Sequence, residues 1–156
     1  MGQIISKNEA KETLEKLKKQ GKTIVFTNGC FDILHVGHVR YLKESARHGD
    51  ILVIGLNSDS SVKRLKGESR PINNENDRAE LLSELNFVDY VIIFEQDSPA
   101  ELLEEIKPNI YTKGADYTLE TLTEANVVLK NGGKVEFINL IEGKSTTNVI
   151  KKIEQK

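Results

Sequence analysis

The sequence contains few of the residues that build disulfide scaffolds, membrane spans or nucleic-acid surfaces. Its single cysteine, Cys30, excludes an internal disulfide and fits a reducing cytoplasm. The longest apolar runs, at 51–56 and 90–94, are far shorter than the roughly 18 residues that cross a bilayer. With 22 Lys+Arg against 24 Asp+Glu the net charge is −2, whereas a dedicated nucleic-acid binder is usually strongly basic. We therefore expect a cytoplasmic protein that acts on small molecules, with neither a membrane nor a nucleic acid as partner.

The length and composition predict one globular domain. The chain has 156 residues, of which 38% are hydrophobic and 29% charged, and this is typical of a single soluble domain with a sizeable core. No internal repeat and no Pro/Gly/Ser-rich linker marks a boundary. We expect a single domain over 1–156, with a core of about 22–153 and a surface helix at 8–20.

Short apolar segments alternate with amphipathic ones along the whole chain, which predicts an α/β fold. Parallel strands need crossover helices, so this alternation indicates a doubly wound parallel sheet of five strands. In such sheets ligands bind outside the carboxyl ends of the strands, where the strand order reverses. The expected strands are 23–27, 51–56, 90–94, 110–113 and 135–139, and the expected helices are 8–20, 36–48, 59–65, 75–85, 99–106, 119–131 and 146–153.

The loop after the first expected strand carries His35 and His38 at the start of a helix. Taken alone, two histidines three residues apart indicate a metal site or ordinary surface residues. Here they follow a strand and the turn at Gly29, and they open a helix whose free amides attract anions. Imidazole donors at that place favour phosphoryl transfer, whereas the glycine fingerprint of dinucleotide-binding proteins is absent from this turn.

A second polar segment, 63–70, holds four basic side chains and one acid, a local charge of +3 in an acidic chain. A charge run of this kind is usually a solvated face. Because the segment follows the second expected strand, it also fits a clamp for an anion. Both interpretations stay open on composition alone.

Several short motifs together resemble the nucleotidyltransferases of the cytidylyltransferase-like superfamily. Within that superfamily they are most similar to the adenylyltransferase domain of bacterial heptose enzymes, from about Lys22 to Ile153. The motifs are Thr27 to His38, Asn57-Ser58-Asp59, Arg64-Leu65-Lys66-Gly67, Arg70-Pro71, Asp77-Arg78, Lys113-Gly114-Ala115-Asp116-Tyr117 and Glu142-Gly143-Lys144-Ser145-Thr146-Thr147.

The resemblance implies a Rossmann-like nucleotidyltransferase fold and a defined reaction. The enzyme would transfer AMP from ATP to D-glycero-β-D-manno-heptose 1-phosphate for cell-surface glycoconjugates, such as lipopolysaccharide. The products would be ADP-heptose and pyrophosphate. Mg²⁺ would enter with ATP, and a homodimer is common in the superfamily. Two alternatives remain: a cytidylyltransferase acting on glycerol 3-phosphate or a similar phosphate monoester, and a non-catalytic nucleotide-binding module.

The resemblance also implies roles for individual residues. His35, His38 and Lys66 would be catalytic, and Arg70 and Arg78 would hold the acceptor phosphate. The nucleotide would contact Thr27, Asn28, Gly29, Cys30, Phe31, Asp32, Lys63, Lys113, Gly114, Asp116, Ser145, Thr146 and Thr147.

Local chemistry offers a structural alternative for several of these residues. Asp32 follows a turn and can bond the backbone instead of a ligand. Asp116 can cap a helix, as can the hydroxyls at Ser145 and its two neighbours. Arg78 can be the solvated partner of a nearby acid in its own helix.

Two positions depart from the heptose enzymes. Ala115 stands where they usually show a second glycine, and Glu124 stands where they commonly carry a glycine. The segment around Glu124 is expected to line the acceptor site. The prediction of a nucleotide site is therefore better supported than the prediction that the acceptor is a heptose phosphate.

Overall fold

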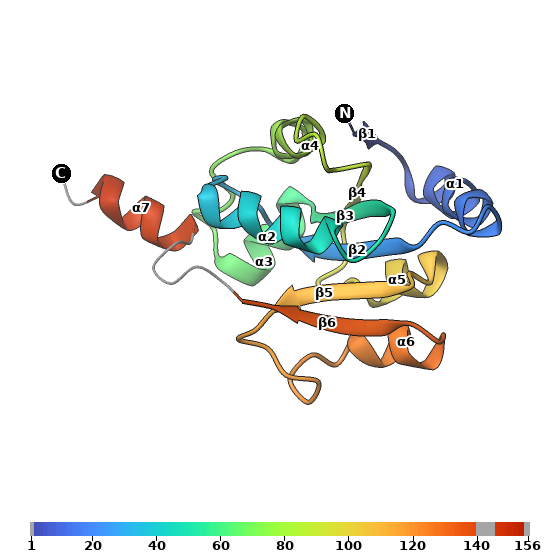
Figure 1. Ribbon diagram of the computed structural model, residues 1–156. Coiled ribbons are helices and arrows are strands. Elements are labelled where there is room, and N and C mark those ends of the chain that lie inside the picture. The colour runs from blue at the N-terminus through green and yellow to red at the C-terminus, as the bar shows by residue number, and fades with distance from the viewer. Residues whose placement is uncertain (1, 140–145, 155–156) are drawn as a thin grey trace.

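Six strands, all parallel, form one sheet in the part of the chain that the structure describes (Figure 1). This computed structural model describes residues 2–139 and 146–154, with side chains given to 139 and from 149. The strand order is β1-β4-β3-β2-β5-β6. The strands are β1 (Gln3–Ile4), β2 (Ile24–Gly29), β3 (Ile51–Asn57), β4 (Tyr90–Phe94), β5 (Ile110–Gly114) and β6 (Lys134–Ile138).

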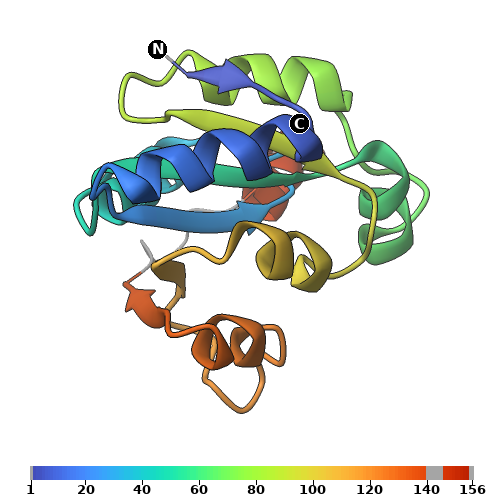
Figure 2. The ribbon, with the colours of Figure 1, turned by 90° about the vertical axis from the view of Figure 1, so that its right-hand side faces the viewer.

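Helices cover both faces of this sheet (Figure 2). The helices are α1 (Lys7–Lys19), α2 (Val36–Ala46), α3 (Asp59–Lys66), α4 (Glu75–Ser83), α5 (Ala100–Ile106), α6 (Ala125–Lys130) and α7 (Thr146–Glu154). One core contains side chains of α1, α5 and α6, and the other contains side chains of α2 and α4. No helix among the described residues is long and apolar enough to cross a membrane.

The strands divide their side chains between the two cores because successive residues of a strand point to opposite faces. In β2, Ile24 and Phe26 join the core under α1 and α5, whereas Val25 joins the core under α2 and α4. All three are fully buried. The uninterrupted apolar runs in the sequence therefore reflect burial on both faces, as is typical of parallel sheets.

The structure corrects two expectations about the elements. The sheet has a sixth strand, β1, at its edge beside β4, and a two-residue strand is too short to leave a periodic signal. The helix expected at 119–131 begins only at Ala125. Before it, Thr118 and Thr121 each accept a hydrogen bond from the other's backbone amide, and this local pairing diverts the chain from helix.

The strand order places a crevice between β2 and β5. From β2 the chain moves to β3 and β4 on one side, and it then returns to add β5 and β6 on the other side of β2. The loops after β2 and β5 leave their strands in opposite directions at this point, so a crevice opens at the carboxyl ends. Ligand-binding residues are expected there.

Close packing at Gly55, in the middle of β3, gives a first testable prediction. A Cβ atom at this position would lie 2.6 Å from Cζ of the buried Phe26. We expect Gly55→Ala to lower the free energy of unfolding by about 1–3 kcal/mol, because the ring has no space to move. Urea unfolding measures this loss.

The double variant Phe26→Leu/Gly55→Ala is the control, since leucine lacks the clashing atom. Its loss should be smaller than the sum of the two single losses. Strictly additive losses would contradict the proposed clash.

Candidate active site

A cavity of about 630 Å³ opens at the carboxyl ends of the strands, at the crevice between β2 and β5. Its wall is built from the segments that follow β2, β3, β4 and β5. Of the residues predicted from the sequence, the wall contains Asn28, Gly29, Cys30, Phe31, His35, His38, Lys66, Arg70, Lys113, Gly114 and Asp116. The structure thus brings together residues from four separate loops.

Two histidines close the amino end of α2 with their own side chains. His35 is the N-cap, and its Nδ1 accepts a hydrogen bond of 3.1 Å from the Gly37 amide. His38 reaches back, and its Nδ1 accepts a hydrogen bond of 3.3 Å from the His35 amide. This is a capping box in which both side chains are imidazoles. The two rings stack, with 3.8 Å between their centroids.

The capping box decides which nitrogen of each ring carries the proton. A neutral imidazole has one donor and one acceptor nitrogen. Because Nδ1 accepts from the backbone in both rings, the proton of each neutral ring resides on Nε2. Burial, with the neighbouring His35 adding to it, lowers the pKa of His38 to about 4, so this ring is neutral at pH 7. The capping box therefore fixes Nε2 as the donor nitrogen of both rings, and both residues lie in the wall of the cavity.

Phe31 holds His38 from the other side. Its ring meets the His38 ring edge-on, with centroids 5.3 Å apart. Phe31 has a φ of 46°, in the left-handed region that side chains other than glycine rarely adopt. A Cβ atom on Gly29 would lie 2.9 Å from the Phe31 ring. Glycine at this position therefore allows the close approach that packs Phe31 against the histidine.

Lys66 and Arg70 provide the cationic part of the wall. Lys66 is the last residue of α3 and is exposed. Arg70 is mostly buried, and its Nε donates a hydrogen bond of 3.0 Å to Asp32. With Nε used in this way, the terminal nitrogens of the guanidinium are the donors that Arg70 presents to an anion.

Asp32, predicted to contact the nucleotide, is bonded to groups of the protein in the structure. This carboxylate is buried and accepts hydrogen bonds from the amides of Ile72 and Asn73 as well as from Arg70. Its oxygens are therefore engaged by protein donors. Asp32 fixes the loop that carries Arg70 onto the loop after β2.

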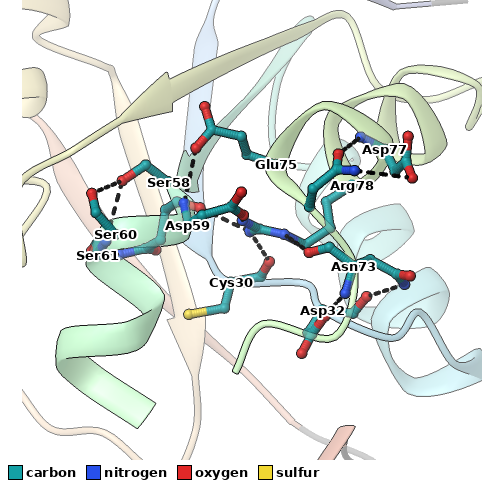
Figure 3. Close-up of polar contacts among 12 residues, drawn as sticks. Cys30, Asp32, Ser58, Asp59, Ser60, Ser61, Asn73, Glu75, Asp77 and Arg78 are labelled. Atoms are coloured by element: carbon teal, nitrogen blue, oxygen red, sulfur yellow. Dashed lines mark hydrogen bonds and ion pairs between the residues drawn. The ribbon is translucent and has the colours of Figure 1, made fainter. Parts of the chain in front are cut away.

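Arg78, predicted to hold the acceptor phosphate, is not among the residues that line the cavity. Figure 3 shows its side chain reaching Cys30 and Asp59. Its side chain is completely buried. Nε donates to the carbonyl of Asn73, Nη1 donates to the carbonyls of Cys30 and Asn57, and Nη2 pairs with Asp59 at 2.7 Å. All these contacts are with protein groups. Arg78 therefore ties together the segments that follow β2 and β3.

Two further predicted residues lie outside the wall. Thr27 is completely buried, donates to the Thr112 carbonyl and lies 2.8 Å from the Tyr41 hydroxyl. It therefore joins β2 to β5 and α2. Lys63 is exposed on α3, one turn before Lys66. Neither residue is among those that line the cavity, and their predicted contact with the nucleotide stays a prediction.

The last predicted group falls largely outside the described residues. Ser145 lies in the segment that the structure does not describe. Thr146 and Thr147 open α7, in agreement with the helix expected at 146–153, and their side chains are not described. Figure 1 shows α7 beyond the carboxyl ends of the strands.

The side of the cavity formed by β5 contains a hydrogen-bonded cluster. The Tyr111 hydroxyl donates to Asn28 Oδ1 at 2.6 Å, and Lys113 Nζ lies 3.4 Å from the same oxygen. Since this oxygen already has two donors, Asn28 offers its NH₂ group to the cavity. Lys113 also lies over the ring of Tyr117, 5.1 Å from its centroid.

The sequence interpretation missed part of the wall. Asp97, Ser98 and Pro99 follow β4, and Tyr41 lies on α2 one turn after His38. The general rule that loops after strands carry ligands points to 97–99, although no motif distinguishes these residues. Tyr41 is aligned with the apolar face of its helix, so its pattern indicates only core packing.

Comparison with known proteins agrees with this geometry. A family model described as Cytidylyltransferase-like matches residues 26–152. The chain belongs to the cytidylyltransferase-like family. The matched segment includes both histidines of the capping box and every described loop of the cavity wall, so the family assignment and the site rest on the same residues.

Relatives within the cytidylyltransferase-like family cover nearly all of the chain. Bifunctional protein HldE of Syntrophotalea carbinolica is 52% identical over 143 residues, which is 92% of this chain and 29% of the relative. Bifunctional protein HldE of Geobacter metallireducens is 54% identical over 140 residues, 90% of this chain and again 29% of the relative. The chain thus spans less than a third of the length of these relatives.

A solved structure supports the fold. The lipopolysaccharide core biosynthesis protein from Thermoplasma volcanium is 35% identical, with a TM-score of 0.64. The match covers 78% of this chain and 98% of that protein.

Arg78 yields a stability prediction. Arg78→Met leaves three buried or part-buried carbonyls and Asp59 without their donor, so we expect a loss of about 3–5 kcal/mol in the free energy of unfolding. Arg78→Lys keeps the charge and should lose less. The exposed Arg47, which pairs with Glu44 on the surface, is the matched control. Arg47→Met should change stability by less than about 1 kcal/mol. Equal losses in urea unfolding of the two methionine variants would contradict the assigned role.

The low pKa of His38 predicts a pH dependence of stability. Unfolded histidine takes up its proton near pH 6.5, whereas folded His38 does so near pH 4. Between these values the unfolded state binds more protons, so the free energy of unfolding should fall as the pH is lowered from about 6.5 to about 4. His38→Asn removes this titration, and its unfolding free energy should depend less on pH over the same range. Identical pH profiles of the two proteins would contradict the buried, neutral imidazole.

Proposed function

We propose that the chain is a nucleotidyltransferase that transfers AMP from ATP to D-glycero-β-D-manno-heptose 1-phosphate, giving ADP-heptose and pyrophosphate. The observation that carries the chemistry is the two-histidine capping box, because it holds two imidazoles with Nε2 as their donor nitrogen in the wall of a cavity that also contains Lys66 and Arg70. The similarity to proteins named HldE and to a lipopolysaccharide core biosynthesis protein supports the sugar phosphate as acceptor.

The proposed reaction is a displacement at the α-phosphorus of ATP. An oxygen of the acceptor phosphate forms a bond to this phosphorus, while the bond to the bridging oxygen of the β-phosphate breaks and pyrophosphate leaves. A phosphate monoester is already ionised at neutral pH, so no general base is required. The protein must align the two phosphates and stabilise the negative charge that spreads over the oxygens.

The residues of the site divide this work. The imidazole N–H groups of His35 and His38 donate to oxygens around the α-phosphorus, at the amino end of α2 where the helix dipole favours an anion. Lys66 stabilises the leaving pyrophosphate, and Arg70 holds the acceptor phosphate. Asn28 and Gly114 contact the nucleoside.

Mg²⁺ fits this site as a companion of the triphosphate. The described residues contain no group of three or more His, Cys, Asp or Glu side chains that fits a metal ion. Mg²⁺ needs only one or two protein carboxylates when phosphates supply further ligands, and Asp116 is an exposed carboxylate in the cavity wall. We assign Asp116 to the ion, which would neutralise charge on the phosphates.

Paired substitutions of His38 test the role of the donor. Asparagine keeps an acceptor near the position of Nδ1 and has no group at Nε2, whereas glutamine places an amide N–H near Nε2. We expect His38→Asn to lower kcat by about 10²- to 10³-fold, the usual cost of removing a donor to a transition-state oxyanion. His38→Gln should retain more activity. Pyrophosphate release measures both, and the exchange of Arg47 serves as the control away from the site.

A substrate panel tests the proposed reaction. Pyrophosphate release is measured with ATP or CTP and with heptose 1-phosphate, glycerol 3-phosphate or ethanolamine phosphate, in the presence of Mg²⁺. ATP with heptose 1-phosphate should give the highest kcat/KM. A higher kcat/KM with CTP and glycerol 3-phosphate would show that the proposed nucleotide and acceptor are wrong. If no pair releases pyrophosphate, the proposed activity itself is wrong.

A further inference from the structure

Glu124 is an acidic residue in a cavity that otherwise suits anions. It lies in the wall immediately before α6 and is half-buried. Its Oε1 is 3.3 Å from the Tyr111 hydroxyl. The phosphate chemistry assigned to the histidines, Lys66 and Arg70 does not use this carboxylate, so its presence in the wall calls for another role.

The surroundings of Glu124 leave it in need of hydrogen-bond donors. Tyr111 has one hydroxyl proton, and its shorter contact, 2.6 Å, is to Asn28. Tyr111 therefore gives Glu124 at most part of a hydrogen bond. A carboxylate accepts several hydrogen bonds, and leaving them unmade in a partly buried position is costly. A bound ligand is well placed to supply the missing donors.

The charges around Glu124 narrow the class of ligand. Lys113 lies on β5, two residues after Tyr111. Burial lowers the pKa of Lys113, and the negative charge of Glu124 opposes this shift. Both side chains lie in the wall of the cavity, so Lys113 supplies a positive charge on the same wall as Glu124. A further anion would be repelled by the carboxylate, and a further cation would compete with Lys113. Neutral donors fit best, and in a phosphorylated sugar or a nucleotide these are hydroxyl groups.

We propose that Glu124, which the Tyr111 hydroxyl contacts in the wall of the cavity, is a specificity-determining residue that accepts hydrogen bonds from substrate hydroxyl groups. The inference rests on the proposed function and adds the substrate feature that is recognised beyond the phosphates. Two substrates carry such hydroxyls: the ribose of the nucleotide and the sugar of the acceptor. The experiment below distinguishes them.

The test combines Glu124→Gln with substrates that lack single hydroxyl groups. Glutamine keeps the size of the side chain and removes its charge, and Glu120→Gln, at an exposed position of the same loop, is the matched control. Values of kcat/KM are measured with ATP, 2′-deoxy-ATP and 3′-deoxy-ATP, and with the acceptor sugar 1-phosphate and its deoxy analogues. Thermal unfolding verifies that each variant is folded.

We expect Glu124→Gln to lower kcat/KM by about 10- to 100-fold with the complete substrates, since the lost hydrogen bonds involve a charged acceptor. With the analogue that lacks the recognised hydroxyl, variant and parent should be equal. A deoxy-ATP that removes the difference identifies the ribose, and a deoxy sugar that does so identifies the acceptor. An equal loss with every substrate, or no loss with any, would overturn the inference.

Failure of the proposed function is distinguishable from failure of this inference. If the parent protein releases no pyrophosphate with any substrate pair, the proposed reaction is wrong. Calorimetric binding of adenosine, 2′-deoxyadenosine and the unphosphorylated methyl glycoside then tests Glu124 separately, because these probes carry no phosphate. Weaker binding of a hydroxylated probe to Glu124→Gln, but not to Glu120→Gln, supports the inference, and unchanged binding of all probes overturns it.

Discussion

The capping box at the start of α2 is the contact on which the site depends. Every helix begins with backbone amides that lack partners within the helix, and here His35 and His38 satisfy two of them through Nδ1. These two hydrogen bonds satisfy backbone amides at the start of the helix, hold both rings in place and select the tautomer with the proton on Nε2. The low pKa of His38 keeps the ring neutral, so the donor is available without a positive charge. The same two side chains thus stabilise the start of α2 and provide the proposed donors to the phosphate.

Buried polar residues beneath the cavity hold the loops that present these donors. Arg78 binds carbonyls after β2 and β3, and Asp32 binds the amides of the loop that carries Arg70. Thr27 links β2 with β5 across the crevice. Loops at the end of a sheet lack the regular hydrogen bonds of strands, so side chains must supply them. Arg78, Asp32 and Thr27 therefore hold the residues of the cavity wall in place, although they do not line the cavity themselves.

The alternating pattern of the sequence was sufficient to predict the architecture, because strands buried on both faces and amphipathic helices leave strong local signals. It failed for β1, which has two residues, and for the start of α6, where paired threonines replace the first turns of helix. In the site, His35 and His38 were predicted from their place after a strand. The motifs also contained Thr27, Asp32 and Arg78, but a motif does not reveal in which direction a side chain points. Only burial and hydrogen bonding separated these supporting residues from the wall.

The central claim, that backbone capping sets the tautomer of both histidines, is open to direct observation. Long-range ¹H–¹⁵N correlation spectra of the protein labelled with ¹⁵N-histidine distinguish protonated from unprotonated ring nitrogens. At neutral pH the account predicts that His35 and His38 both carry their proton on Nε2, and that Nδ1 is unprotonated. Spectra that show either residue with its proton on Nδ1, or His38 as a charged imidazolium at this pH, would contradict it.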